Sequence, residues 1–258
     1  MHLLRTRLAN DIVAEFLPPK KSSNKVIFFC DGLPTLPSKK RLLEFWAKRG
    51  YWVIHPRYRG TWESSGEFLA GTPDKDILDC VDFLQTNPEI NSGQGKKIVS
   101  LWDNKEYDIS AKEFYIIGSS FGGATALMAS RHAKIKKVVA ICPLIDWLAP
   151  SDNNEDLQKF DKLIKNAFGE AYRFAPGAWD KVKTGEFFNP IKHVEDLDGN
   201  KIMIIQTADD MICRLETAET FAKKTNCRLH IFKKGGHMSA SIAGKLRFYW
   251  KIKKFFKK

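Results

Sequence analysis

The sequence predicts an α/β fold in which a mostly parallel, doubly wound sheet carries helices on both faces. Short apolar runs alternate with segments of helical periodicity along most of the chain, and this alternation favours parallel strands joined by crossover helices. One strand-like run leads directly into the glycine- and serine-rich sequence 118–123, and an alanine-rich helix follows it. The length of 258 residues suits one domain of this kind.

The chain begins with a predicted hairpin, whose strands 3–8 and 12–16 flank the turn pair Asn10-Asp11. Short apolar runs predict core strands at 26–29, 51–54, 114–117, 138–142, 202–206 and 229–232. Helices are expected at 41–48, 74–84, 122–133, 215–224 and 243–256. The second of these helices places Ile77, Val81 and Leu84 at helical spacing, which predicts one buried side.

Two segments interrupt the alternation. Residues 95–110 are typical of an inserted hairpin that turns at Asp103-Asn104. Residues 143–199 separate two core strands and contain helical stretches at 157–168 and around 178–183. An insert here is expected over the carboxyl end of the sheet, where α/β proteins carry their chemistry, so it is a candidate lid. We therefore expect one domain, 1–258, with two inserts.

The composition limits the class of partner. The net charge is +12, with much of the excess at 20–25 and 245–258. A basic surface attracts nucleic acid, anionic lipid or acidic substrates, but no nucleic-acid-binding motif accompanies the charge, so nucleic acid is not expected as a partner. No run approaches the roughly 18 apolar residues that span a bilayer, and the charged N-terminus does not suggest a signal peptide. The five cysteines are odd in number and lack a metal-binding spacing, which indicates free thiols in a reducing cytoplasm.

The strongest local signal is the strand-to-helix turn around Ser120, with glycine two residues away on each side. A sharp turn of this kind strains its central residue and pushes that side chain clear of the sheet. Gly118 and Gly122 suit the turn because a Cβ at either position would collide with a neighbouring strand or helix. The Phe121 N–H then faces the same side as the hydroxyl, at a helix N-terminus, and can stabilise an oxyanion. We therefore predict Ser120 as a nucleophile.

A serine nucleophile needs a base and an acid that orients the base, and in this fold they follow the serine in the order acid, then histidine. His237 lies in a glycine-rich loop after the last predicted strand, whereas His230 lies within that strand and is interpreted as structural. The acid is expected after the strand at 202–206, where Asp209 and Asp210 are adjacent. The spacing does not choose between them.

Taken together, these residues resemble the prolyl oligopeptidase family within the α/β-hydrolases, including its dienelactone-hydrolase-like and acylaminoacyl-peptidase-like relatives. The matching motifs span most of the chain: Asp31-Gly32, Arg57-Tyr-Arg59-Gly60, Ser65-Gly66, Gly118-Ser-Ser-Phe-Gly-Gly123, Pro143-Leu-Ile-Asp146-Trp147, Asn189-Pro190, Thr207-Ala-Asp-Asp-Met-Ile212 and Gly236-His237. The resemblance implies that the first aspartate of the Thr207 motif, Asp209, is the acid.

The chain departs from the family pattern at the first buried strand, where the usual His-Gly is replaced by Cys30-Asp31-Gly32. Large peptidases of the family place an oxyanion-binding tyrosine in this loop, and Cys30 stands at that position. We therefore expect an oxyanion hole built from the N–H groups of Leu33 and Phe121. The segment before Val26 is too short for the family's propeller domain, so its amine-recognising glutamates cannot be carried over. Gln206 also stands where the family normally has glycine.

The expected reaction is acyl transfer to water through an acyl-enzyme, with no metal or organic cofactor. An ester or thioester is the first expected substrate, and a short or acylated peptide is the alternative. Trp62 and Trp147 could line an acyl pocket or pack the insert onto the sheet, and Arg57 could bind a substrate carboxylate or tie loops together by ion pairs.

An alternative of another class is a non-catalytic protein that binds a partner or a membrane surface. Aromatic and basic residues alternate in the C-terminal segment, as they do in interfacial helices. The simpler interpretation is the closing helix of the fold, docked by its aromatic side with its lysines in water.

Overall fold

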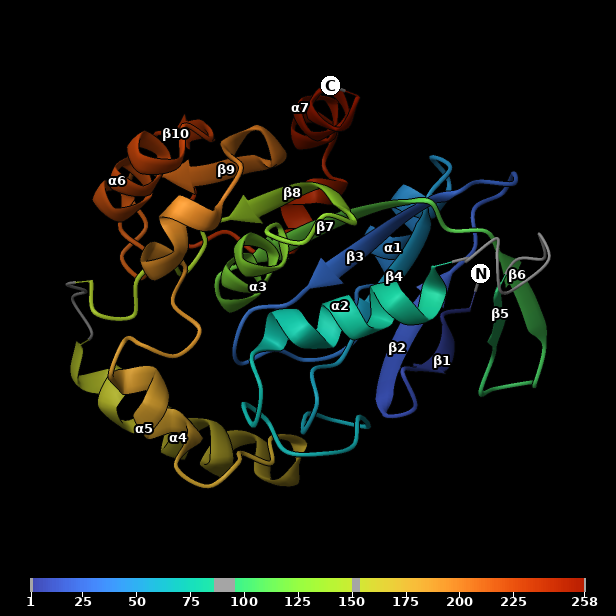
Figure 1. The fold of residues 1–258 in the computed structure, drawn as a ribbon, viewed down its shortest axis with the longest axis horizontal. Coiled ribbons are helices and arrows are strands. Elements are labelled where there is room, and N and C mark those ends of the chain that lie inside the picture. The colour runs from blue at the N-terminus through green and yellow to red at the C-terminus, as the bar shows by residue number, and fades with distance from the viewer. Residues whose placement is uncertain (1, 86–95, 150–153, 258) are drawn as a thin grey trace.

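The computed structural model describes residues 2–85, 96–149 and 154–257, and its centre is an eight-stranded sheet in the order β1-β2-β4-β3-β7-β8-β9-β10 (Figure 1). The N-terminal hairpin of β1 and β2 is antiparallel and joins the sheet antiparallel to β4, whereas the remaining neighbours pair in parallel. The strands are β1 (Leu4–Leu8), β2 (Ile12–Leu17), β3 (Lys25–Cys30), β4 (Trp52–Pro56), β7 (Glu113–Ser119), β8 (Ile135–Ile141), β9 (Ile202–Thr207) and β10 (Arg228–Phe232).

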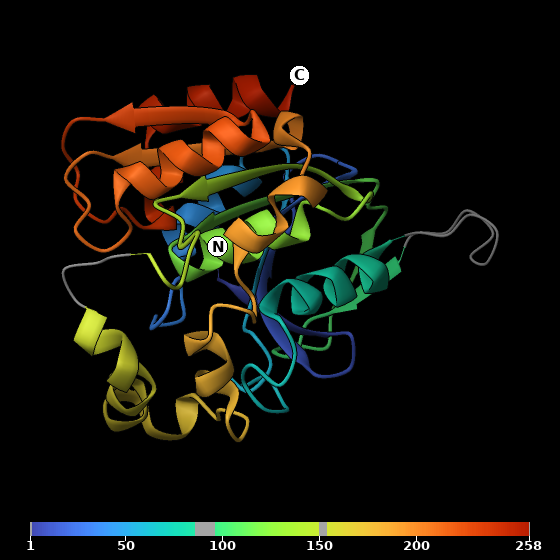
Figure 2. The same ribbon diagram turned by 60° about the vertical axis from the view of Figure 1, so that its left-hand side comes forward.

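Helices cover both faces of the sheet. One face holds α2 (Pro73–Leu84), α3 (Phe121–Ala129) and α6 (Leu215–Thr225), and the other holds α1 (Lys40–Ala47) and α7 (Leu246–Phe256) (Figures 1 and 2). The side chains of β3 alternate between the two layers, so that Val26 and Phe28 join the first core and Ile27 and Phe29 join the second. This arrangement confirms the predicted doubly wound fold.

Some element boundaries differ from the predicted ones for identifiable reasons. α3 ends at Ala129 and not at residue 133, because the Ser130 hydroxyl donates to the Leu127 carbonyl, 2.6 Å away, and competes with the helical ladder. The predicted helix 243–256 is divided, since Lys245 is extended between a 3-10 turn and α7. The short 3-10 helices are η1 (Gly169–Ala171), η2 (Pro190–Asp196), η3 (Gly199–Lys201) and η4 (Ala240–Gly244).

The predicted inserted hairpin is present as a two-stranded antiparallel sheet, β5 (Lys96–Val99) and β6 (Glu106–Ile109). Asn104 lies in its turn with a positive φ of 56°, which asparagine tolerates better than most residues. Residue 95, the first of the predicted segment, lies outside the described residues. The hairpin packs beside the first strand, where the Leu101 N–H donates to the Arg5 carbonyl at 2.7 Å.

The longer insert forms α4 (Asn154–Phe168) and α5 (Ala178–Lys183), which stand apart from the two helix layers (Figures 1 and 2). Isolated bridges join Thr61 to Tyr172 and Phe68 to Phe174. These bridges fix the insert to the loop that follows β4, at the carboxyl end of the sheet. Among the described helices, none combines the length and the apolar character needed to cross a membrane.

Candidate active site

Ser120 occupies a strained turn between β7 and α3. Its φ of 54° and ψ of −122° fall in a region that residues with a Cβ rarely adopt. The turn is held by hydrogen bonds from the Ser120 N–H to the Ile141 carbonyl, 3.0 Å, and from the Gly123 N–H to the Ser120 carbonyl, 2.9 Å. A Cβ placed on Gly32 would lie 3.2 Å from the Ser120 Cβ and 3.8 Å from its Oγ. The serine side chain therefore lies against the loop after β3.

The glycines around Ser120 permit close backbone contacts. A Cβ on Gly118 would lie 1.9 Å from the Gly122 carbonyl oxygen, and a Cβ on Gly122 would lie 2.2 Å from the Cys30 carbonyl oxygen. Both distances are far below van der Waals contact, so neither position accepts a side chain without moving the backbone. A side chain at either position would therefore collide with its neighbours, as the sequence predicts. The absence of a side chain at Gly122 lets the start of α3 lie against the end of β3.

His237 is held by a buried carboxylate from the loop after β9. Its Nδ1 lies 2.9 Å from Oδ2 of Asp210 and 3.1 Å from Oδ1. Asp210 also accepts hydrogen bonds from the Ile212 and Cys213 N–H groups and from Gln206 Nε2. Burial raises the pKa of Asp210, but His237 and these donors outweigh burial and leave the pKa below its usual value. The ionised carboxylate therefore holds Nδ1–H and leaves Nε2 available for chemistry.

The prediction that Asp209 holds the imidazole is wrong. Asp209 is exposed, and its oxygens accept from the Gly236 N–H at 2.8 Å and from the Gly235 N–H at 3.2 Å. These two N–H groups hold its pKa below the usual range. The difference arises after β9, where the chain turns so that Asp210 points inward and accepts from N–H groups two and three residues ahead. Asp209 braces the glycine pair that precedes His237.

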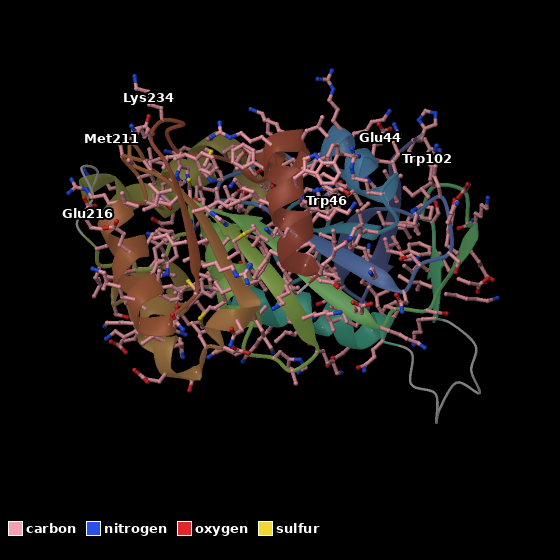
Figure 3. All side chains as sticks on the ribbon, turned by 90° about the horizontal axis from the view of Figure 1, so that it is seen from above. Glu44, Trp46, Trp102, Met211, Glu216 and Lys234 are labelled. Carbon is pink, nitrogen blue, oxygen red and sulfur yellow. The ribbon has the colours of Figure 1, made fainter. Side chains whose placement is uncertain are left out.

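Four loops converge at the carboxyl edge of the sheet. The Ile141 carbonyl that binds the Ser120 N–H is followed by Cys142, whose Sγ accepts from the Met238 N–H at 3.4 Å. Ligand atoms of Cys142, Asp210 and His237 all lie within 4.8 Å of one another. Figure 3 shows Met211 and Lys234, from the loops after β9 and β10, at the same end of the molecule. The loop that carries His237 is therefore linked through Cys142 to the end of β8, where the Ile141 carbonyl binds the Ser120 turn.

Within the described residues, Cys142, Asp210 and His237 are also close enough together to hold a metal ion. Burial raises the pKa of the Cys142 thiol to about 12, so the sulfur is a neutral thiol at physiological pH. Asp210 and His237 already share a hydrogen bond. The arrangement is suited to proton transfer through the imidazole.

The loop after β3 carries Leu33, the second expected oxyanion donor. In this loop Leu33 is half-buried, and a Cβ added at the preceding residue, Gly32, would lie close to the Ser120 side chain. Phe121 is the first residue of α3, where N–H groups have no partner within the helix and carry the positive end of its dipole. Cys30 is buried within the sheet, and burial raises the pKa of its thiol above the ordinary value. Its side chain therefore does not replace the family's oxyanion tyrosine.

Two of the three predicted substrate-binding residues are placed elsewhere. Arg57 is buried and forms ion pairs with Glu15, 3.2 Å, and Glu63, 2.7 Å, so the prediction that it binds a substrate carboxylate is wrong and the ion-pair alternative holds. Trp147 is 5% exposed, and its Nε1–H donates to the Phe188 carbonyl at 2.7 Å. It packs the insert onto the sheet and is not free to bind substrate.

Trp62 remains partly accessible. Its ring contacts Phe168 and Tyr172 of the insert, each with a centroid distance of 6.3 Å. The Tyr172 hydroxyl accepts from the Thr35 N–H at 3.0 Å and donates to the Thr35 carbonyl at 3.3 Å. The insert thus contacts the same loop that carries Leu33, a contact that the sequence pattern did not reveal.

Sequence reasoning also missed a buried ionic cluster under this loop. His55 lies between Asp31 and Glu15, with Nε2 2.7 Å from Asp31 and Nδ1 3.5 Å from Glu15. The available signal was a charged residue inside each of two apolar strands, since Glu15 belongs to β2 and His55 to β4. Charged side chains at such positions are almost always paired when buried.

Comparison with known proteins places this geometry among hydrolases. The family model of X-Pro dipeptidyl-peptidases (S15 family) matches residues 10–158, and that of the prolyl oligopeptidase family matches residues 97–258. No curated protein matches the chain in sequence.

Solved structures with the same fold include an esterase, an acylaminoacyl peptidase and a protein called Est1E. An esterase of Pyrococcus furiosus is similar at a TM-score of 0.64 and 16% identity, covering 99% of this chain and 89% of its own. An acylaminoacyl peptidase of Pyrococcus horikoshii gives 0.66 and 17%, covering 99% of this chain but 41% of its own. Est1E of Butyrivibrio proteoclasticus, with ferulic acid bound, gives 0.60 and 14%, covering 97% and 98%. At these identities the likeness shows a shared fold.

Proposed function

Since the chain belongs to the prolyl oligopeptidase family of α/β-hydrolases and is a serine hydrolase, we propose that Ser120, His237 and Asp210 form its catalytic triad. The observation that carries this proposal is the 2.9 Å contact between His237 and Asp210, in a loop linked through Cys142 to the strand end that binds the strained turn of Ser120. We further propose a small carboxylic ester or thioester as the substrate.

In the proposed mechanism, Ser120 Oγ attacks the substrate carbonyl carbon while His237 Nε2 accepts the hydroxyl proton. The Asp210 carboxylate keeps the imidazole oriented and stabilises the imidazolium. The N–H groups of Leu33 and Phe121 bind the developing oxyanion, which stabilises the tetrahedral intermediate more than the ground state. The imidazolium then protonates the leaving alcohol or thiol, and water releases the acyl group by the reverse sequence of proton transfers.

The preference for an ester rests on the surroundings of Trp62. This indole lies in an aromatic group with Phe168 and Tyr172, next to the loop that carries Leu33. An apolar wall at this place suits an acyl chain, and the Pyrococcus furiosus esterase, most of whose chain is covered, has the same fold. A peptidase acting on short or acylated peptides is the second candidate, favoured by the two matching peptidase families.

The test compares two adjacent serines. Ser120→Ala should abolish labelling by a fluorophosphonate probe and reduce hydrolysis of p-nitrophenyl butyrate at least about a thousandfold, since the nucleophile is lost. Ser119→Ala is the matched control, because Ser119 is buried at the end of β7 and should keep both properties. Undiminished turnover in Ser120→Ala would reject the triad. A panel of acyl p-nitrophenyl esters, thioesters and aminoacyl amides then separates the two candidate substrates.

We propose a cytoplasmic location and no requirement for a membrane. All five cysteines are free thiols, which is the usual state in a reducing compartment. The aromatic side of α7 is buried against the sheet through Phe248, Tyr249 and Phe256, as the simpler interpretation predicts. Sedimentation with anionic vesicles, with and without residues 246–258, tests the membrane alternative.

A further inference from the structure

We propose that His55, a buried histidine outside the triad, is a positioning residue that holds the oxyanion loop, residues 31–35, through its ion pair with Asp31. This inference rests on the proposed function, because it assigns His55 a role in aligning the Leu33 N–H for the same reaction.

The geometry around His55 indicates an imidazolium. The ring is 2% exposed, and each of its nitrogens faces a carboxylate, Asp31 at 2.7 Å and Glu15 at 3.5 Å. A neutral imidazole can donate from one nitrogen alone, so it would present a lone pair to one of the two carboxylates. The protonated ring donates to both and bridges β2, β4 and the end of β3.

The charged side chains around His55 include Asp31, Glu15 and Arg57, and Lys39 lies on the far side of Asp31. Burial lowers the pKa of His55 and so does Arg57, but Asp31 and Glu15 outweigh them and leave the pKa above its ordinary value. Burial raises the pKa of Asp31, but His55 and Lys39, whose Nζ is 3.5 Å away, hold it below the usual range. Glu15 is held low in the same way by His55 and Arg57.

The ion pair acts at one end of the oxyanion loop. Asp31 immediately precedes Gly32, where an added Cβ would lie 3.2 Å from the Ser120 Cβ, and Leu33, the proposed donor, comes next. Tyr58 also holds this end, because its hydroxyl donates to the Asp31 carbonyl at 3.2 Å. The far end of the loop is held by the hydrogen bond from the Thr35 N–H to the Tyr172 hydroxyl. Loss of the ion pair therefore leaves the end nearest the nucleophile held by Tyr58 alone among these two contacts, while the other end keeps its bonds to Tyr172.

A small displacement of this loop is enough to affect the reaction. An oxyanion donor acts only when it lies about 3 Å from the position of the developing charge, and misplacements near 1 Å cost large factors in rate. Substrate binding depends mainly on the acyl and leaving-group contacts. Loss of the His55 charge should therefore reduce kcat and leave KM nearly unchanged.

The experiment uses His55→Gln, which fills a similar volume and can still donate to Asp31 but cannot carry a charge. With p-nitrophenyl butyrate we expect kcat to fall about tenfold, a part of the 10²–10³ cost of removing a donor outright, and KM to change less than about twofold. In the wild type, kcat should also decline as pH rises through the raised pKa of His55. This alkaline decline should be absent in His55→Gln.

The matched control is Asp74→Asn. Asp74 is another buried carboxylate, which lies in α2 and pairs with Arg131 at 3.5 Å. The substitution should lower the melting temperature without changing kcat or the pH profile. If His55→Gln lowers only the melting temperature, as the control does, the positioning role is overturned.

A readout without catalysis separates this inference from the proposed function. In isotope-labelled Ser120→Ala protein, the Gly32 and Leu33 amide resonances should titrate with the same midpoint as the His55 ring. Amide shifts that ignore the His55 titration overturn the inference even when wild-type esterase activity is found. Coupled shifts support it even when no ester is hydrolysed.

Discussion

At the scale of single residues, Asp210 and Asp209 divide two tasks between identical side chains. Asp210 has no exposed side-chain surface and binds His237, whereas Asp209 is exposed and binds the backbone of the glycine pair before it. Their environments differ because one side chain points into the edge of the sheet and its neighbour points out. The two residues therefore provide a matched pair for testing the triad.

We predict that Asp210→Asn reduces kcat by about 10³ to 10⁴, because an amide cannot stabilise the imidazolium and favours the wrong tautomer. Asp209→Asn should reduce kcat less than about fivefold, since the amide oxygen can still accept from one N–H. Steady-state kinetics on p-nitrophenyl butyrate measure both. Equal losses in the two variants would contradict the assignment of Asp210.

At the scale of elements, the contact between α3 and β3 determines where the nucleophile and the oxyanion loop lie relative to each other. The contact depends on the absence of a side chain at Gly122, which brings the helix to the Cys30 carbonyl. A single methyl group at this position must push the two elements apart.

We predict that Gly122→Ala lowers the free energy of unfolding by about 2–3 kcal/mol, the upper range for overpacking a core. Gly71→Ala is the control, because a Cβ there meets nothing within 4 Å and its φ is not positive. The control should stay within about 1 kcal/mol of the wild type. Urea denaturation followed by tryptophan fluorescence measures both, and equal stabilities would refute the close contact.

The insert and the oxyanion loop are joined through Tyr172. Tyr172→Phe removes the hydroxyl that bonds both backbone groups of Thr35. We expect a loss of about 1 kcal/mol in stability, typical of a hydrogen bond, together with a larger KM for long-chain esters, because the aromatic group around Trp62 loosens. The KM for p-nitrophenyl acetate, which lacks a long acyl chain, should stay within twofold. A KM raised equally for both esters would contradict this role.

At the scale of the whole molecule, the cluster of Glu15, Asp31 and His55 predicts how stability depends on pH. The two carboxylates have lowered pKa values, so their contribution is present above about pH 4 and is lost as the pH falls through those values. His55 has a raised pKa, so its contribution is complete below the ordinary value of about 6.5 and is lost as the pH rises above that value, through the raised pKa of the folded protein.

The cluster should therefore stabilise the protein most between about pH 4.5 and 6.5. Calorimetry across pH 3–9 measures this as a maximum in the melting temperature relative to the double variant Glu15→Gln/His55→Gln. The difference between the two proteins should shrink toward both ends of the range. A constant difference at every pH would show that the ion pairs of the cluster do not contribute to stability.

The sequence predicts the local features of this molecule better than the contacts between side chains that lie far apart in the chain. Periodicity located the strands and helices, and the glycine spacing around Ser120 identified the turn, because these signals depend on neighbouring residues. The partner of His237 depends on which way one residue of a loop points, and the partners of Arg57 depend on the order β2-β4-β3 in the sheet. Neither orientation nor strand order is encoded in a local pattern, so the sequence chose the wrong aspartate for His237 and offered ion pairs for Arg57 without naming the partners.

The antiparallel hairpin of β1 and β2 lies at one margin of the sheet, far in sequence from the serine turn, yet Glu15 extends from it to His55. Trimming the chain to its parallel portion would therefore expose a strand edge and leave an imidazolium in the interior with half of its counter-charge missing. A shortened version of this protein should keep the first 17 residues, since they supply the Glu15 carboxylate that faces His55.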